Sequence, residues 1–203
     1  MSRALVTGSA GRPGRSVAAA PAAAGHEVIG VDPAPGTPRE AAEDRAVTAR
    51  PLPEADAWAL ELAFTLHNRT DGPPTIRSPA RKGRVGAGYG GSFWRAPEDS
   101  AEPEVCTAEA RGEPAVHGGR TPWPVLTGRG WSLVFVQVRG LDPWFVRVAE
   151  HPGVGPAPAR DTPLRVPDRL DRAITVVVAD GRLTAERAGA LAELVVNRPG
   201  GDP

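Results

Sequence analysis

The chain has 203 residues, enough for one domain or two small ones, and its 24 basic residues balance 24 acidic ones. No basic stripe is interleaved with aromatic residues, so we expect no nucleic-acid partner. The single cysteine, Cys106, excludes an internal disulfide and a cysteine-rich metal site. Because no apolar run approaches the roughly 20 residues of a membrane-spanning helix and no signal peptide opens the chain, we expect a soluble cytoplasmic protein without a membrane partner.

The first segment is typical of the start of a dinucleotide-binding fold. The apolar run at residues 4–7 predicts a buried parallel strand, and the following TGSAGRPG spaces Gly8, Gly11 and Gly14 evenly. Such glycines permit a tight strand-to-helix turn, a close approach to a pyrophosphate, and close packing of the helix on the strand. Residues 16–24 would form the helix whose N-terminal amide groups hold the phosphates.

A second apolar strand, HEVIGVD, comes after this segment and ends at Asp32. An acidic residue at about this distance after the glycines bonds the ribose hydroxyls in dinucleotide-binding folds. Its carboxylate would repel a 2′-phosphate, so NAD is favoured over NADP as the cofactor. The alternative is a βαβ unit that packs against the rest of the chain and binds nothing.

The stretch VTGSAGRPGRSV…GHEVIGVD resembles the N-terminus of the extended short-chain dehydrogenases, the NAD-dependent epimerase/dehydratase family, over about residues 3–36. The resemblance implies an NAD(P)-binding, oxidoreductase-like protein. The positions that it places at the cofactor are Gly8, Gly11, Arg12, Pro13, Gly14 and Asp32.

The catalytic pair of that family is missing from this chain. Family members use Tyr-x-x-x-Lys, in which the lysine lowers the pKa of the tyrosine so that it can transfer a proton near neutral pH. Here Phe93 stands four residues after Tyr89, and the only lysine, Lys82, precedes the tyrosine. The catalytic residues therefore stay unknown, and whether the chain is an enzyme is left open.

The next segment changes character. Residues 37–55 are rich in Pro, Ala, Glu and Arg, which favours a linker with one short helix around residues 39–46. In WALELAFTLHN, large apolar residues then alternate with small or polar ones, and this period of two predicts a half-buried strand. The alternating apolar residues are Trp58, Leu60, Leu62, Phe64 and Leu66.

Further strands are expected towards the C-terminus. WSLVFVQV (131–138) and PWFVRVAE (143–150) flank RGLD and predict a hairpin, and AITVVVAD (173–180) predicts another strand. Thr184 is placed to cap a helix that runs to about Val196.

The expected fold class is α/β plus mainly β: an incomplete Rossmann-type βαβ start followed by a β-sandwich-like domain with a C-terminal helix. We expect a partial dinucleotide-binding unit at residues 1–36, a linker at 37–55, a β-rich domain at 56–197 and a disordered tail at 198–203.

This second part resembles the C-terminal half of the methane-oxygenase-like (PmoA-named) bacterial family of unknown function. The segments GRVGAGYGGSFWR and DPWFVR carry most of the likeness, which spans roughly residues 56–183. The resemblance implies a β-sandwich of the kind found in carbohydrate-handling proteins. The histidine-rich N-terminal half of that family has no counterpart here.

The side chains of the second part suggest few sites. Aromatic faces stack on sugar rings, so a sugar pocket would use Tyr89, Phe93, Trp94 and Arg95, and the alternative is that these aromatics pack in the core or at an edge. The four histidines share no metal-ligand spacing, so no metal site is expected. Cys106 lies in an acidic stretch without basic neighbours, which argues against an activated thiolate.

Three hypotheses remain for the whole chain. It binds a dinucleotide, or it is a non-catalytic β-sandwich that binds a small carbohydrate or a protein partner, or it is a hybrid whose halves cannot close their cores. The first segment cannot bury both faces alone. It would dock on the β-rich part, for which residues 173–180 and the helix after them are the expected partner, or complete its sheet in a homo-oligomer.

Overall fold

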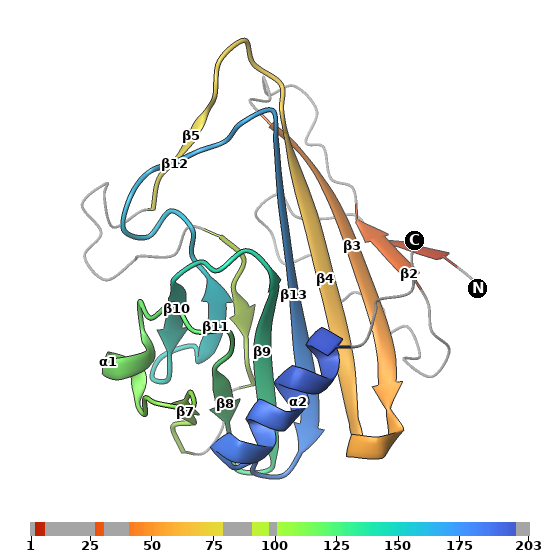
Figure 1. Ribbon diagram of the computed structural model, residues 1–203, viewed down its shortest axis with the longest axis vertical. Helices are drawn as coiled ribbons and strands as arrows, with labels where there is room; N and C mark the ends of the chain where they lie inside the picture. Colours follow the sequence, from red (N-terminus) through yellow and green to blue (C-terminus); the bar gives the residue numbers. More distant parts are fainter. Residues whose placement is uncertain (1–2, 7–26, 31–40, 79–90, 98–100, 198–203) are drawn as a thin grey trace.

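The computed structural model describes residues 3–6, 27–30, 41–78, 91–97 and 101–197, which are mainly β-strand (Figure 1). No helix in these ranges has the length and apolarity that crossing a bilayer requires. The strands are β1 (Arg3–Val6), β2 (Glu27–Gly30), β3 (Ala41–Leu52), β4 (Ala57–Asn68), β5 (Thr75–Ile76), β6 (Trp94–Arg95), β7 (Glu104–Cys106), β8 (Val125–Thr127), β9 (Trp131–Arg139), β10 (Trp144–Arg147), β11 (Gly153–Pro156), β12 (Leu164–Arg165) and β13 (Arg169–Asp180). The helices are the 3-10 turn η2 (Pro53–Ala55), α1 (Glu113–Val116) and α2 (Ala185–Asn197).

The described strands form a large sheet, a smaller sheet and a short ribbon. The large sheet has the order β1-β2-β3-β4-β13-β9-β8-β7, the smaller sheet β10-β11-β6, and the ribbon joins β12 to β5. Apart from the parallel β1–β2 pair, the described strand pairs are antiparallel. The expectation of a mainly β fold that ends in a helix is confirmed.

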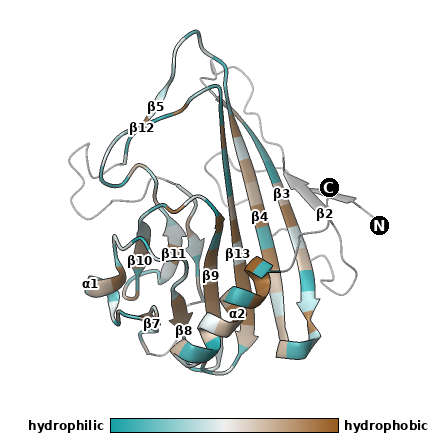
Figure 2. Ribbon diagram, in the orientation of Figure 1, coloured by the Kyte–Doolittle hydropathy of each residue, from teal (hydrophilic) through white to brown (hydrophobic). Residues whose placement is uncertain are grey.

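Both faces of the large sheet are covered around β9. Because side chains alternate along a strand, Val134 and Val136 face α2, whereas Leu133 and Phe135 face the opposite side. On that side Trp144 and other residues of the smaller sheet complete a second apolar cluster. Figure 1 shows α2 lying across the large sheet, and Figure 2 shows the apolar residues concentrated in this part of the fold.

Strand β4 confirms the predicted strand, but the large apolar residues expected on its buried side are only half-buried. Its pairing with β13 runs from Ala57 to His67, so the whole predicted segment is strand. The fully buried residues are Ala57 and Ala59, which pack in the cluster under α2. The intervening Trp58 lies on the opposite face of the strand and is half-buried.

The linker expected at residues 37–55 is wrong over most of its length. Residues 41–52 form β3, which pairs with β4 in continuous register from Ala41↔Asn68 to Leu52↔Ala57, so the short helix expected around residues 39–46 is wrong as well. The helix preference of residues such as Ala and Glu is overridden, because pairing with β4 satisfies the backbone hydrogen-bonding groups of both strands. An ion pair of 2.6 Å between Arg50 Nε and Glu61 Oε1 joins the two strands.

The hairpin expected around RGLD is also wrong. Both strands exist, but β9 belongs to the large sheet and β10 to the smaller one. Gly140 at φ 91° turns the chain away from β9, and Gln137 exchanges two hydrogen bonds of 2.8 Å with the backbone of Asp142. The chain therefore crosses between sheets instead of folding back on its own strand.

The predicted last strand and the helix after it are confirmed, whereas the tail expected at residues 198–203 lies outside the described residues. Strand β13 contains the predicted residues 173–180 and ends before Gly181, whose φ of 74° suits glycine. Thr184 Oγ1 accepts a hydrogen bond of 3.2 Å from the backbone N–H of Arg187, which is the expected cap of α2.

The N-terminal strands join the large sheet through β3. Strands β1 and β2 pair in parallel from Arg3↔Glu27 to Val6↔Gly30, and β2 pairs antiparallel with β3. The expected docking on residues 173–180 is wrong, because both edges of β13 are taken by β4 and β9. The helix predicted at residues 16–24 lies outside the described residues.

We predict that Leu191→Ala lowers the free energy of unfolding by about 2–5 kcal/mol, because Leu191 is 1% exposed in the cluster between α2 and the large sheet. Val196→Ala on the same helix is the matched control, since Val196 is 53% exposed, and it should change stability by no more than about 0.5 kcal/mol. Urea unfolding measures both values, and equal effects would contradict the packing of α2.

Candidate functional site

The residues predicted to hold a dinucleotide lie outside the described residues. Their binding role therefore stays a prediction. They are Gly8, Gly11, Arg12, Pro13, Gly14 and Asp32.

The predicted aromatic sugar pocket does not form from Phe93 and Trp94. Trp94 packs edge-on against Phe135 between the sheets, with ring centroids 6.4 Å apart. Phe93 packs on Phe145 at 5.5 Å, where Gly153 makes room because a Cβ there would lie 2.6 Å from the Phe93 ring. Both residues are half-buried and packed against other rings, in agreement with the alternative of core or edge packing. Arg95 is exposed, and Tyr89 lies outside the described residues.

The histidines and the cysteine form no reactive cluster in the part of the chain that the structure describes. No three His, Cys, Asp or Glu side chains there are placed to hold a metal ion. His67 Nε2 lies 2.8 Å from Asp44 Oδ2 on an exposed stretch of the large sheet. Burial raises the pKa of the Cys106 thiol more than nearby Arg111 lowers it, which disfavours the thiolate.

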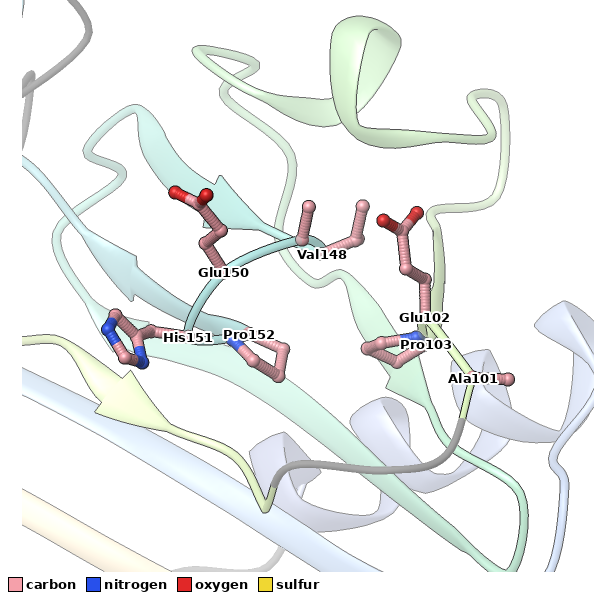
Figure 3. Close-up of a pocket in the computed structure, with 8 residues that line it drawn as sticks. Ala101, Glu102, Pro103, Val148, Glu150, His151 and Pro152 are labelled. Atoms are coloured by element: carbon pink, nitrogen blue, oxygen red, sulfur yellow. The ribbon is translucent and has the colours of Figure 1, made fainter.

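The candidate site is an open depression beside the turn between β10 and β11, which we call the hollow. Its volume is about 540 Å³, within the range of small-ligand sites. Figure 3 shows the carboxylates of Glu102 and Glu150 turned to the same side, with Val148 between them, and the His151 ring turned away from Glu102. The lining residues are Ala101, Glu102, Pro103, Val148, Ala149, Glu150, His151 and Pro152.

The turn that carries part of the hollow has an unusual backbone. Glu150 has a φ of 37° and His151 a φ of 69°, so two consecutive non-glycine residues lie in the left-handed region. Each such residue costs on the order of 1–3 kcal/mol, and strain of this kind is concentrated at functional sites. Glycine would remove the strain but would also remove the two polar side chains from the rim.

Hydrogen bonds hold the two ends of this turn. At its start the backbone N–H of Val148 donates to Glu113 Oε2 at 2.8 Å. At its end the carbonyl of Pro152 accepts a hydrogen bond of 2.8 Å from the backbone N–H of Ala96, the residue after β6. The left-handed residues lie between these two attachments.

The charge of the hollow is negative. Among the described residues that line it, two are glutamates and none is lysine or arginine. Carboxylates accept hydrogen bonds from hydroxyl and amine donors, and they repel anionic groups. Val148, Pro103 and Pro152 supply apolar surface beside them. The hollow can therefore hold a neutral ligand that has both hydroxyl groups and C–H surface.

A cationic and aromatic cluster lies on the outer side of β10. The Arg147 guanidinium carbon sits 4.6 Å from the centre of the Phe145 ring, and His117 packs edge-on against the same ring at 5.2 Å. His117 Nδ1 lies 3.1 Å from the carbonyl of Val146, and its Nε2 lies 3.4 Å from Nε of Arg160. Burial lowers the pKa of His117, and the charges of Arg160 and Arg147 lower it further, against the opposing hydrogen bond to Val146 and the Glu113 carboxylate.

Sequence reasoning missed every residue of the hollow as a binding residue. Glu150 appeared only as the end of a predicted strand, and Glu102 only as part of an acidic stretch. The local signal was the run Glu150-His151-Pro152-Gly153, in which polar residues and Pro-Gly interrupt two apolar segments. Nothing in the local sequence indicates that this run lines the same hollow as residues 101–103.

Comparison with known families places the chain in one of them. Residues 30–193 match a family of unknown function, DUF6807. No curated protein matches the chain. The match includes the described lining residues of the hollow and begins after the glycine motif, at the last residue of β2. The resemblances to the epimerase/dehydratase and methane-oxygenase-like families stay predictions.

We predict that His117 titrates below its ordinary pKa of 6.5 in the folded protein, which a pH titration of its imidazole proton resonances would measure. Since the unfolded chain then binds the proton more tightly, the contribution of His117 to stability is fully present above pH 6.5 and is lost as the pH falls through the lower folded value. A titration midpoint at or above 6.5 would contradict the burial and the two arginine neighbours.

Proposed function

Because the chain belongs to the DUF6807 family of unknown function, its function must be argued from the hollow, and we propose that the hollow binds a polyhydroxylated ligand of the carbohydrate class. The observation that carries this proposal is the pair of left-handed residues at the rim, Glu150 and His151. Strained non-glycine residues are concentrated at active sites and ligand-binding sites.

The chemistry of the lining favours a sugar over a purely apolar ligand. Glu102 and Glu150 each offer a carboxylate that accepts hydrogen bonds from neighbouring hydroxyl groups. Between them, Val148 and the two prolines offer apolar surface to the C–H face of a sugar ring. A carbohydrate presents both kinds of surface at once, which fits a site of few polar groups on an apolar wall.

The charge of the hollow also favours one class of sugar. A uronic acid or a phosphorylated sugar would place a negative charge near two carboxylates, and the described lining residues include no lysine or arginine to compensate it. A neutral oligosaccharide meets no such repulsion. The family match supports a role for this region, because it contains the lining residues that the structure describes and excludes the glycine motif.

We predict that a neutral oligosaccharide such as cellotetraose stabilises the protein against heat, whereas tetragalacturonate does not. A ligand at about 100 times its dissociation constant stabilises the native state by roughly 2.7 kcal/mol, which a thermal shift assay detects easily. Glu150→Gln and Glu102→Gln should each weaken binding roughly 10-fold or more, because each removes a charged hydrogen-bond acceptor.

Glu109→Gln is the matched control, since Glu109 is exposed and is not among the described residues that line the hollow. Equal binding by the three variants and the wild-type protein would contradict the assignment. Stronger binding of tetragalacturonate than of cellotetraose would contradict the charge argument.

A second function is favoured by the parallel pairing of β1 and β2. Parallel strands require a crossover connection of a dozen or more residues, and the chain has residues 7–26 between them. In the sequence, Gly8 comes two residues after the end of β1, and Asp32 comes two residues after the end of β2. The carboxyl ends of parallel strands share one edge of a sheet, which is where dinucleotides bind in α/β folds. This order supports NAD binding by the first segment.

We predict that NAD raises the unfolding temperature while NADP does not, because Asp32 would repel the 2′-phosphate. Gly11→Val and Asp32→Ala should both abolish the shift, and Asp71→Ala, in an exposed turn, should preserve it. Differential scanning calorimetry with millimolar dinucleotide measures the effect. An NAD shift that survives both changes would place the binding elsewhere in the chain.

A further inference from the structure

We propose that Glu113 of α1 is a positioning residue for the hollow, holding the turn that carries Glu150 and His151 in its binding conformation. This inference rests on the proposed binding of a carbohydrate by the hollow. Glu113 itself does not line the hollow, so it acts through Val148 and Arg147.

One carboxylate of Glu113 makes two contacts at the start of the turn. Its Oε2 accepts a hydrogen bond of 2.8 Å from the backbone N–H of Val148, and its Oε1 accepts one of 2.9 Å from Nη1 of Arg147. Val148 lines the hollow between the two glutamates, as Figure 3 shows. The position of the first turn residue therefore depends directly on Glu113.

Glu113 is itself held by rigid neighbours. Its carbonyl accepts a hydrogen bond of 2.8 Å from the backbone N–H of His117, and Val116 of the same short helix is 2% exposed in the apolar cluster between the sheets. Its partner Arg147 lies over the Phe145 ring and also donates to the carbonyl of Val146 at 3.1 Å. The carboxylate thus fixes the turn relative to the packed helix α1.

The opposite end of the turn is held independently by Ala96, through the carbonyl of Pro152. Between the two attachments lie only Ala149 and the two left-handed residues. If the attachment at Val148 is lost, the turn can relax towards backbone conformations without positive φ. Apparent affinity then falls in proportion to the fraction of molecules that keep the binding conformation.

The test compares Glu113→Ala and Glu113→Gln with the wild-type protein by calorimetric titration of cellotetraose. The Gln side chain keeps an oxygen that can accept the Val148 hydrogen bond, whereas Ala has none. We expect Glu113→Ala to bind at least tenfold more weakly and Glu113→Gln to recover most of the affinity. Glu109→Ala, which removes the same charge from an exposed position, should bind as the wild-type protein does.

Hydrogen exchange of the Val148 amide, measured in the same variants, reports on the attachment itself. Exchange should accelerate in Glu113→Ala and stay slow in Glu113→Gln, with α2 protection unchanged in both. Unaltered binding by Glu113→Ala, or equal losses in the Ala and Gln variants, would overturn the positioning role.

If the wild-type protein binds no cellotetraose or other neutral oligosaccharide, the proposed function fails, and the exchange measurement alone decides whether Glu113 holds the turn. Slow Val148 exchange in Glu113→Ala would then overturn the inference as well. Failure of the function and failure of the positioning role therefore give different results.

Discussion

The crossing of the chain from the large sheet to the smaller one depends on a nearly buried ion pair between Arg172 and Asp142. Arg172 Nε lies 2.6 Å from Asp142 Oδ2, and the two side chains are only 18% and 10% exposed. Arg172 belongs to β13, which pairs with both β4 and β9, so the ion pair ties the crossing segment to the centre of the large sheet. Removing one partner of such a pair would leave an uncompensated charge in a poorly hydrated place.

Strand β10, which begins directly after this crossing, positions the hollow. Its first residue, Trp144, is fully buried between the sheets, and the indole N–H donates to the carbonyl of Thr121 at 2.8 Å. With β10 fixed in this way, the next turn projects at the end of the smaller sheet, where Glu113 and Ala96 attach to it. A strained turn can persist only where its surroundings over-determine it, and here packing and hydrogen bonds act on both sides.

Strand β3 joins the two N-terminal strands to the rest of the large sheet. It pairs along its whole length with β4 and also carries β2, so the parallel N-terminal pair continues an antiparallel sheet. The DUF6807 match begins at the last residue of β2, and β1 lies outside it. The large sheet therefore contains strands from the matched region and from the segment before it. The two N-terminal strands belong to this sheet and do not have to be stable as an isolated two-stranded unit.

The sequence by itself determined the elements whose signals are local. The alternation of β4, the apolar run of β13 and the Thr184 cap of α2 each depend on neighbouring residues, and all three were predicted. Only the tertiary structure decided the rest. Strand β3 consists largely of helix-forming or charged residues and becomes a strand because β4 offers it a long ladder of backbone hydrogen bonds. Glu102 and Glu150 are far apart in the chain but line the same hollow, and no local pattern in the sequence indicates this arrangement.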